Sequence, residues 1–380
     1  MRGHLLLPLV GLTWTLALPA QQVTRPRPGE GRTPEFPPPS ILEYKPRSTL
    51  KVPEHLVPRA KFPAIDFHGH PPALSDEATI NGVGKAMDDL NLRVMISANS
   101  NSPDRLAPQM AAVKASKYKD RFVFFTGLNL INIGPGSGAK IAAQLEADIK
   151  AGAVGVGEIG KGFGLGMQKA DGTRLKLDDP ELDVVWETAA QLKIPIFIHT
   201  ADPAEFFEPI DFHNERWLEL ALFSGRRYND RSKYPSFEDL MGERDRMLAK
   251  HPKTVFVLAH LGWHAQNLAR LGKMFDSLPN LYAEMGAVLY DLGRQPFTGH
   301  DFFVKYQDRL LFGKDSFQPD EYPYYWRVLE TRDEYFDYYR DYHAFWKMYG
   351  LGLPDPVLKK LYYGNALKIV PGISKEGFPK

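Results

Sequence analysis

Eight short apolar segments between residues 64 and 312 place the strongest constraint on what this chain can fold into. They cover residues 64–68, 92–98, 121–128, 153–159, 194–199, 254–260, 280–285 and 309–312. Amphipathic segments with helical periodicity separate many of them, at residues 77–90, 105–118, 140–151, 180–192 and 237–250. Strands joined by helical crossovers pair in parallel. The pattern therefore predicts an α/β fold, a (β/α)₈ TIM barrel, with a doubly wound open sheet as the alternative.

The first 63 residues differ in composition from the rest. Arg2 and His4 precede an apolar run at residues 5–18 and then Ala20, which is the layout of a signal peptide. We expect residues 1–20 to be removed and the protein to be secreted or periplasmic, with an uncleaved membrane anchor as the alternative. Ten prolines fall in residues 21–63, so this segment is expected to form an extended Pro-rich N-terminal arm. Residues 64–380 would then form the barrel domain.

Composition excludes several classes of protein and of site. The chain has no cysteine, which excludes disulfides, thiolate metal sites and cysteine nucleophiles. Its 47 basic and 46 acidic residues leave a net charge of +1, which argues against a nucleic-acid-binding protein. Any metal must therefore be bound by histidine, carboxylate or backbone oxygen atoms.

Histidines and one aspartate stand at the ends of four predicted strands. His68 and His70 end the first strand two residues apart, so their side chains share one face. His199 ends the fifth strand, His260 ends the sixth, and Asp315 follows the eighth. A barrel brings the C-terminal ends of its strands onto one rim, and imidazoles together with a carboxylate suit a divalent metal.

The order of these residues and three short segments around them resemble a known family. The segments are residues 65–70, 259–262 and 364–366. They are similar to the amidohydrolase superfamily, and within it to the amidohydrolase-related (amidohydrolase 2) family of metal-dependent TIM-barrel hydrolases and decarboxylases. The resemblance covers about residues 62 to 370 and implies an enzyme that uses a metal-activated water.

The resemblance also implies which residues bind the metal. The expected ligands of one ion, most simply Zn²⁺, are His68, His70, His199 and Asp315. His260 is expected to stabilise developing oxyanion charge in catalysis while Asp315 moves the proton. One departure from the family pattern is Lys314, where relatives commonly have Ser or Thr, and its side chain should point away from that of Asp315.

The fourth predicted strand ends in a glycine-rich segment, residues 155–162, that contains Glu158 and Lys161. The segment matches the glycine spacing of dinucleotide-binding loops, but the glycines that follow cannot open a helix. Two-metal members of the superfamily place a carboxylate at this strand end to bridge the ions. We therefore expect Glu158 to be either a metal ligand or a carboxylate that orients a ligand histidine, with one ion favoured over two.

Three functions remain open. The first is hydrolysis of an amide, lactone or ester of a small molecule, and the second is non-oxidative decarboxylation of a small unsaturated or aromatic acid at the same site. The third is a barrel that binds without catalysis, against which the complete ligand set argues. Lys161, Arg294 and Trp263 are candidate substrate-binding residues, the two basic ones because they could hold a carboxylate. We expect a small-molecule substrate, no nucleic acid and no stable membrane span, and we leave a homo-oligomer open.

Two further features have more than one interpretation. Residues 317–350 are dense in aromatic side chains with acidic residues between them. They are interpreted as a helical pair packed on the barrel, as a lid, or as a subunit contact. His264, four residues after His260, is interpreted as a surface residue near the start of a helix, with a residue that lines the site as the alternative.

Overall fold

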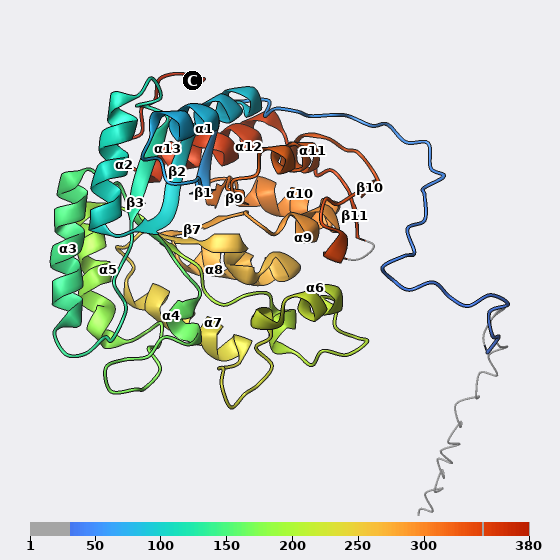
Figure 1. Cartoon of the computed structure of the whole chain (residues 1–380), viewed down its shortest axis with the longest axis horizontal. Helices are drawn as coiled ribbons and strands as arrows, with labels where there is room; N and C mark the ends of the chain where they lie inside the picture. Colours follow the sequence, from blue (N-terminus) through green and yellow to red (C-terminus); the bar gives the residue numbers. More distant parts are fainter. Residues whose placement is uncertain (1–30, 344–345, 380) are drawn as a thin grey trace, which may run out of the picture. The chain divides into compact units, whose positions relative to one another are not determined.

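Parallel strands form the core of the structure, a computed structural model that describes residues 31–343 and 346–379 (Figure 1). The strands are β1 (Ala64–His70), β2 (Leu92–Asn101), β3 (Phe122–Thr126), β4 (Val156–Ile159), β5 (Ile196–Ile198), β6 (Phe256–Leu258), β7 (Leu281–Glu284), β8 (Leu310–Leu311) and β9 (Asp315–Ser316). Strands that are neighbours in the chain are hydrogen-bonded neighbours in the sheet from β1 to β8. All of these pairs are parallel, as the sequence predicts.

β8 and β9 are two sections of the eighth strand, and together they close the sheet into a barrel. β8 pairs with β7, and β9 pairs with β1 in a register that places Asp315 opposite Gly69. Between the two sections, the Phe67 amide donates to the Phe312 carbonyl at 2.9 Å. The first and last strands therefore lie side by side, which confirms the TIM barrel and excludes the open sheet.

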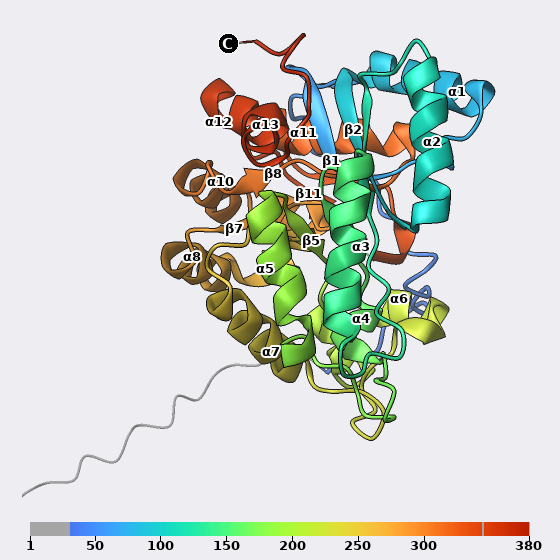
Figure 2. The same cartoon turned by 90° about the vertical axis from the view of Figure 1, so that its left-hand side faces the viewer.

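Helices cover the outside of the barrel, as Figures 1 and 2 show. They are α1 (Glu77–Leu90), α2 (Pro103–Ala115), α3 (Ser137–Ala151), α4 (Gly162–Leu165), α5 (Asp183–Leu192), α6 (Trp217–Leu222), α7 (Phe237–Lys250), α8 (Leu268–Ser277), α9 (Leu289–Gly293), α10 (Pro296–Lys305), α11 (Tyr322–Glu330), α12 (Asp355–Lys359) and α13 (Asn365–Ile369). α1 shows why they form where they do. It begins where the Asp76 carboxylate accepts from the Thr79 amide at 2.8 Å, and it ends at Asn91 in a left-handed conformation.

The predicted signal peptide, residues 1–20, lies outside the described residues. Contacts divide the chain into one unit of residues 1–46, of which 31–46 are described, and a compact unit of residues 47–380. In the described part of the chain, no helix is both long and apolar enough to cross a membrane.

The second half of the predicted arm, residues 47–63, belongs to the same unit as the barrel. The Lys61 ammonium lies 2.6 Å from a carboxylate oxygen of Asp355 at the start of α12. The His55 amide donates to Asp333 at 2.8 Å. Polar contacts therefore tie this segment to the C-terminal part of the chain.

The aromatic insertion is packed structure. It contains α11 and a short antiparallel ribbon of β10 (Phe336–Asp337) and β11 (Lys347–Met348). The prediction of a helical pair is therefore wrong within the described residues. Burial alternates with a period of two at residues 336–338, which is the pattern of a strand. On α11, fully buried Tyr322 donates to the carboxylate of Asp66 at 2.5 Å, so the insertion also supports β1.

Candidate metal centre

β1 brings two histidines to the rim of the barrel with their Nε2 atoms facing the site. His68 is fully buried, and its Nδ1 lies 2.8 Å from Oε1 of Glu284. The Nδ1 of His70 lies 3.0 Å from Oδ1 of Asn99. Because each Nδ1 faces an oxygen acceptor, it carries a proton, which leaves Nε2 as the nitrogen available to an ion. Both rings are thus oriented as metal ligands.

Glu158, on β4, lies between two groups of histidines. Its Oε2 is 3.3 Å from Nε2 of His68 and 3.2 Å from Nε2 of His70. Its Oε1 is 2.7 Å from Nδ1 of His199 and 3.9 Å from Nε2 of His260. One carboxylate therefore faces β1 with one oxygen and the ends of β5 and β6 with the other. These direct approaches place Glu158 among the donor atoms themselves.

Asp315 completes the first group from β9. Its Oδ1 lies 4.0 Å from Nε2 of His68 and 3.8 Å from Nε2 of His70. Its φ of 81° is a left-handed conformation that residues with a Cβ rarely adopt. The buried side chain of Lys314 pairs with Glu321 instead, so its charge is directed away from Asp315 as the parity of the strand predicts.

His260 stands at the start of a left-handed turn. Residues 260–263 all have φ between 52° and 61°. The left-handed conformation costs about 1–2 kcal/mol for each residue that has a Cβ. Buried Arg244 donates to the Gly262 carbonyl at 2.9 Å, and the His260 amide donates to Glu284 at 2.7 Å. These bonds hold the turn and fix the imidazole at the rim.

The ring orientation of His260 determines what it can do. Its Nδ1 lies 2.8 Å from the carbonyl oxygen of Gly286, so Nδ1 donates and Nε2 presents a lone pair. Burial, together with the charges of His199 and His68, lowers the pKa of His260 to about 4. Neutral His260 therefore binds an ion or accepts a proton at Nε2, and it can donate to an oxyanion only after it has been protonated.

Glu284 is a site residue that the sequence analysis did not predict. It is fully buried on β7 and accepts from Nδ1 of His68, from the His260 amide and, at 2.6 Å, from the Gly286 amide. One carboxylate thus orients the ring of His68 and anchors the turn that carries His260. The sequence did contain a signal for Glu284. It is a carboxylate at the end of an otherwise apolar strand, in the same position as the histidines.

Gly313 leaves space for the side chain of Glu284 because glycine has no Cβ. A Cβ added at Gly313 would lie 2.4 Å from Oε2 of Glu284 and 2.7 Å from Cβ of His68. We expect Gly313→Ala to lower the free energy of unfolding by about 1–3 kcal/mol through overpacking, and to weaken metal binding. Urea denaturation and metal analysis measure the two effects. Gly225→Ala is the control, because nothing lies within 4 Å of its added Cβ. Equal stability of the two variants would contradict this account.

The side chains that could bind an ion are those of His68, His70, Glu158, His199, His260 and Asp315, here called the donor set. This set fits a divalent cation. Burial opposes ionisation, but Glu284 and Glu158 raise the pKa of His68 well above its usual value. Burial also opposes the charge of Glu158, and the imidazoles of His68 and His199 nevertheless hold the pKa of Glu158 well below its usual value. The centre therefore stabilises positive charge next to Glu158. Nε2 of His68 and Nε2 of His199 are buried without a hydrogen-bond partner among the described residues, and imidazoles with carboxylates are ligands of Zn²⁺ and related ions.

Two of the predicted substrate-binding residues lie beside the donor set. The ring of Trp263 is 4.5 Å from that of His260, centroid to centroid. Nζ of Lys161 lies 2.6 Å from one oxygen of Asp202, whose other oxygen is 3.7 Å from Nε2 of His199. Lys161 is thus at the edge of the centre, but its charge is already paired with buried Asp202.

Arg294, the third predicted substrate-binding residue, lies in a different cluster. Its guanidinium pairs with Glu215, lies 2.7 Å from Oδ1 of Asp291, and stacks 4.1 Å from the ring of Trp346. Its remaining hydrogen bond in the described structure goes to the Tyr290 carbonyl. These contacts connect α9 to the insertion and do not include a donor residue of the centre.

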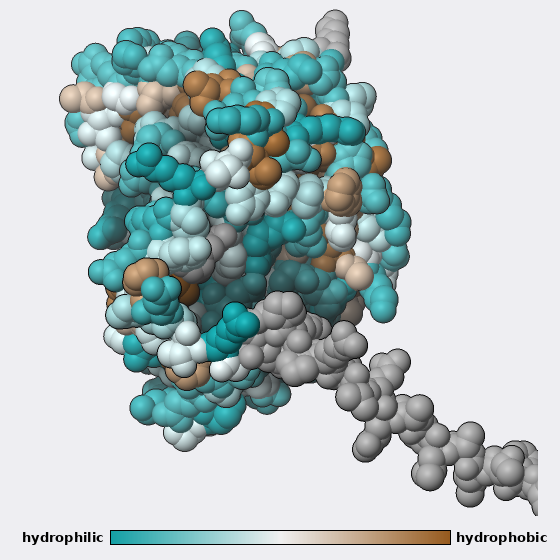
Figure 3. Space-filling view, turned by 90° about the vertical axis from the view of Figure 1, so that its right-hand side faces the viewer, coloured by the Kyte–Doolittle hydropathy of each residue, from teal (hydrophilic) through white to brown (hydrophobic). Residues whose placement is uncertain are grey.

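A hollow with largely hydrophilic visible walls opens on the face that carries α6, α9 and the β10–β11 ribbon (Figure 3). These elements all follow the C-terminal ends of strands. Active sites of TIM barrels lie on that face.

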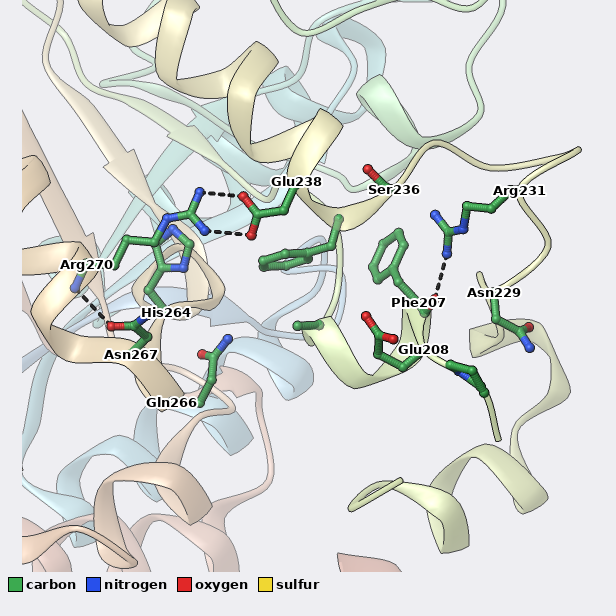
Figure 4. Close-up of a pocket in the computed structure, with 13 residues that line it drawn as sticks. Phe207, Glu208, Asn229, Arg231, Ser236, Glu238, His264, Gln266, Asn267 and Arg270 are labelled. Carbon is green, nitrogen blue, oxygen red and sulfur yellow. Dashed lines mark hydrogen bonds and ion pairs between the residues drawn. The ribbon is translucent and has the colours of Figure 1, made fainter. Parts of the chain in front are cut away.

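A separate cavity of about 660 Å³ contains none of the donor residues (Figure 4). Arg270 and Glu238 pair in its wall at 2.7 Å. His264 lines it, yet His264 is 1 % exposed, so its interpretation as a surface residue is wrong. Burial and the charge of Arg244, 3.0 Å from its Nε2, lower the pKa of His264 to about 2.

Comparisons with known proteins point to one family. The pattern of the family described as Amidohydrolase matches residues 55–372. An uncharacterized TIM-barrel protein from Bordetella bronchiseptica is 18% identical over 80% of this chain and 97% of its own, with a TM-score of 0.49. A dihydroxybenzoic acid decarboxylase from Polaromonas sp., solved with bound manganese, is 16% identical over 80% of this chain and 96% of its own, with a TM-score of 0.49. A 4-oxalomesaconate hydratase from Rhodopseudomonas palustris is 14% identical over 81% and 95%, with a TM-score of 0.47. No curated protein sequence matches the chain.

Proposed function

We propose that this chain, which belongs to the amidohydrolase family, is a metal-dependent hydrolase. Its substrate would be an amide, lactone or ester of a small molecule. The observation that carries the proposal is that imidazoles at the strand ends converge on both oxygens of Glu158. Asp315 faces Nε2 of His70 in the same group. Imidazoles and carboxylates that converge on one point suit a divalent cation, and a carboxylate beside that cation can accept a proton in metal-assisted hydrolysis.

We infer that His68, His70, Asp315 and Glu158 would hold one ion, most simply Zn²⁺. A divalent ion in such a site would polarise a carbonyl group and would lower the pKa of a bound water to about 7. His199, expected from the family resemblance to bind this same ion, instead faces Oε1 of Glu158 together with His260. That second group offers donors for a second ion.

We infer that Asp315 moves the proton of the attacking water. Burial opposes ionisation, but the imidazoles of His68 and His260 lower the pKa of Asp315 below its usual value, so its carboxylate is available as a base. It takes the proton from the attacking water and returns it to the leaving amine or alkoxide. For His260 to donate a hydrogen bond to the developing oxyanion, Nε2 must first take a proton from solvent, because Nδ1–H donates to Gly286 and Asp315 takes the proton of the attacking water.

Removal of the metal is expected to stop the reaction. We expect dialysis against a chelator to lower hydrolysis by about 100-fold or more, and added Zn²⁺ or Mn²⁺ to restore it, because the imidazoles alone do not activate water. The measurement combines metal content with acid release from a panel of amides, lactones and esters, and with CO₂ release from small aromatic acids. CO₂ release without hydrolysis of any ester or amide would replace the proposed reaction with decarboxylation. Full hydrolysis by the metal-free protein would reject it.

Alanine at either histidine of β1 tests the ligands directly. We expect His68→Ala and His70→Ala each to lose most of the bound metal and of the activity, because each variant removes one ring whose Nε2 faces Glu158. His213→Ala is the matched control, because His213 is exposed and should keep both. Wild-type metal content in both β1 variants would show that the ion lies elsewhere.

A further inference from the structure

A groove on the outside of the barrel is separate from the metal centre. It lies between α2 and α3, which Figure 2 shows side by side, and it has a volume of about 750 Å³. None of the donor set lines it. Sites that bind small molecules usually have volumes of about 300–1,000 Å³. The size of the groove therefore suits a small-molecule ligand.

The floor and the two walls of the groove are apolar. β3 and the segment before β4 form the floor, where Val123 and Val154 are only partly buried. The walls carry Leu106, Met110, Ala111 and Val113 of α2, and Ala147 and Ala151 of α3. Covering apolar surface that is open to water is favourable in proportion to its area. The groove therefore favours an apolar ligand along its length.

One end of the groove is basic. Lys114 in the last turn of α2 and Lys119 before β3 both line it and are exposed. Neither lysine has an ion-pair partner in the described part of the chain. The lining contains one carboxylate, that of Asp148, which is buried and accepts from Thr126 at 2.7 Å and from Gln144 at 2.8 Å. Two positive charges at this end are thus left for an anionic group.

The shape of the groove favours a single chain over a helix or a membrane. A Cβ added at Gly152 would lie 2.5 Å from Cε of Met110, so the two walls approach closely there. A helix with its side chains is about 10 Å wide and would not fit between them. Binding to a bilayer needs apolar side chains that protrude. Among the described residues, the large exposed hydrophobic side chains all lie outside this lining.

We propose that the groove between α2 and α3 binds one fatty-acid-like molecule, a single alkyl chain that ends in a carboxylate. The chain lies along the apolar walls, and the carboxylate faces Lys114 and Lys119. Hydrogen bonds between ammonium groups and a carboxylate are stronger than those between neutral groups. The site adds a binding activity to the protein that does not depend on the proposed hydrolysis.

The test compares two soluble amphiphiles by titration calorimetry on the purified metal-loaded protein. Decanoate and decyltrimethylammonium have alkyl chains of similar length and opposite charge, and both are used below the concentration at which they form micelles. We expect decanoate to bind at least about tenfold more tightly, because two exposed lysines attract it and repel the cation. Equal affinities, or no binding of decanoate, would overturn the proposal.

Tryptophan on either wall should fill the groove. We expect Ala147→Trp on α3 and Ala111→Trp on α2 each to weaken decanoate binding at least about tenfold, because the indole occupies the place of the alkyl chain. Both alanines are exposed, and two variants on opposite walls guard against a folding defect in one of them. Ala78→Trp is the control, since Ala78 is exposed on α1 and lies outside the lining.

Removal of the two charges should reduce the preference for the anion. We expect Lys114→Gln combined with Lys119→Gln to weaken decanoate binding about threefold to tenfold and not to weaken binding of decyltrimethylammonium. Lys368→Gln on α13 is the control, because Lys368 is exposed and lies outside the lining. An unchanged preference in the double variant would overturn the role of the lysines.

Three further measurements exclude other sites and other occupants. His68→Ala should bind decanoate like the wild type, and loss of binding there would assign the carboxylate to the metal. Binding to phosphatidylglycerol vesicles without binding of free decanoate would make the groove a membrane contact. A dimer in sedimentation velocity that Ala147→Trp dissociates would place a second copy there. Each of these results would overturn the proposal, and loss of hydrolysis alone would reject only the proposed function.

Discussion

Replacing Glu158 with glutamine is expected to lower both bound metal and turnover further than any other single change at the strand ends. The carboxylate approaches histidines from both sides, at 3.2 Å from His70 and 2.7 Å from His199. Glutamine removes the negative charge and turns one of the two acceptor atoms into a donor that faces an imidazole. We expect turnover to fall by more than about 100-fold, beyond what the loss of a residue behind a ligand usually costs. Metal per chain and kcat measure the effect.

The same variant decides the number of ions. One ion per wild-type chain that is lost in Glu158→Gln supports the single site of His68, His70 and Asp315. Two ions in the wild type, with one or none in the variant, would show that Glu158 bridges them. Glu146→Gln, an exposed substitution on α3, is the control and should keep the wild-type content. Full metal content in Glu158→Gln would remove Glu158 from the site.

Replacing Glu284 with glutamine is expected to weaken both the fold and the metal site without touching the ion itself. The carboxylate accepts three hydrogen bonds with both of its oxygens, from His68, His260 and Gly286. The amide nitrogen of glutamine must face at least one of these N–H groups, which leaves a buried donor unpaired. We expect the free energy of unfolding to fall by about 1–3 kcal/mol and metal affinity to fall about 10- to 100-fold. Denaturation and metal titration are the measurements.

Glu330→Gln provides the matched comparison for Glu284→Gln. Glu330, on α11, also accepts two hydrogen bonds, from the Lys61 amide at 2.9 Å and the Tyr362 hydroxyl at 2.8 Å. It has no contact with the donor set among the described residues, and the amide oxygen of glutamine can accept both bonds because both go to Oε1, so metal affinity should not change. If both variants changed metal affinity equally, the effect of Glu284 would be one of general destabilisation and not of ligand orientation.

The sequence by itself determined the order of the strands and the residues at their ends. Burial along a strand or a helix is recorded in the spacing of apolar residues, because neighbours in the chain share one element. For that reason α1 and α7 span residues 77–90 and 237–250 as predicted. The parallel order of a barrel then brings the strand-end histidines together without any further information.

Only the tertiary structure decided which polar groups meet. His68 and Glu284 are 216 residues apart in the chain, and they meet because closure of the barrel leaves only the eighth strand between β1 and β7. Lys161 and Arg294 are both basic residues after strand ends, and the sequence cannot tell that Asp202 and Asp291 take up their charges. Lys314 and Arg340 both pair with Glu321, and only the fold shows that the ammonium of Lys314 is the closer of the two. Charge pairing depends on distances in space between distant segments, and residue spacing along one element carries no record of those distances.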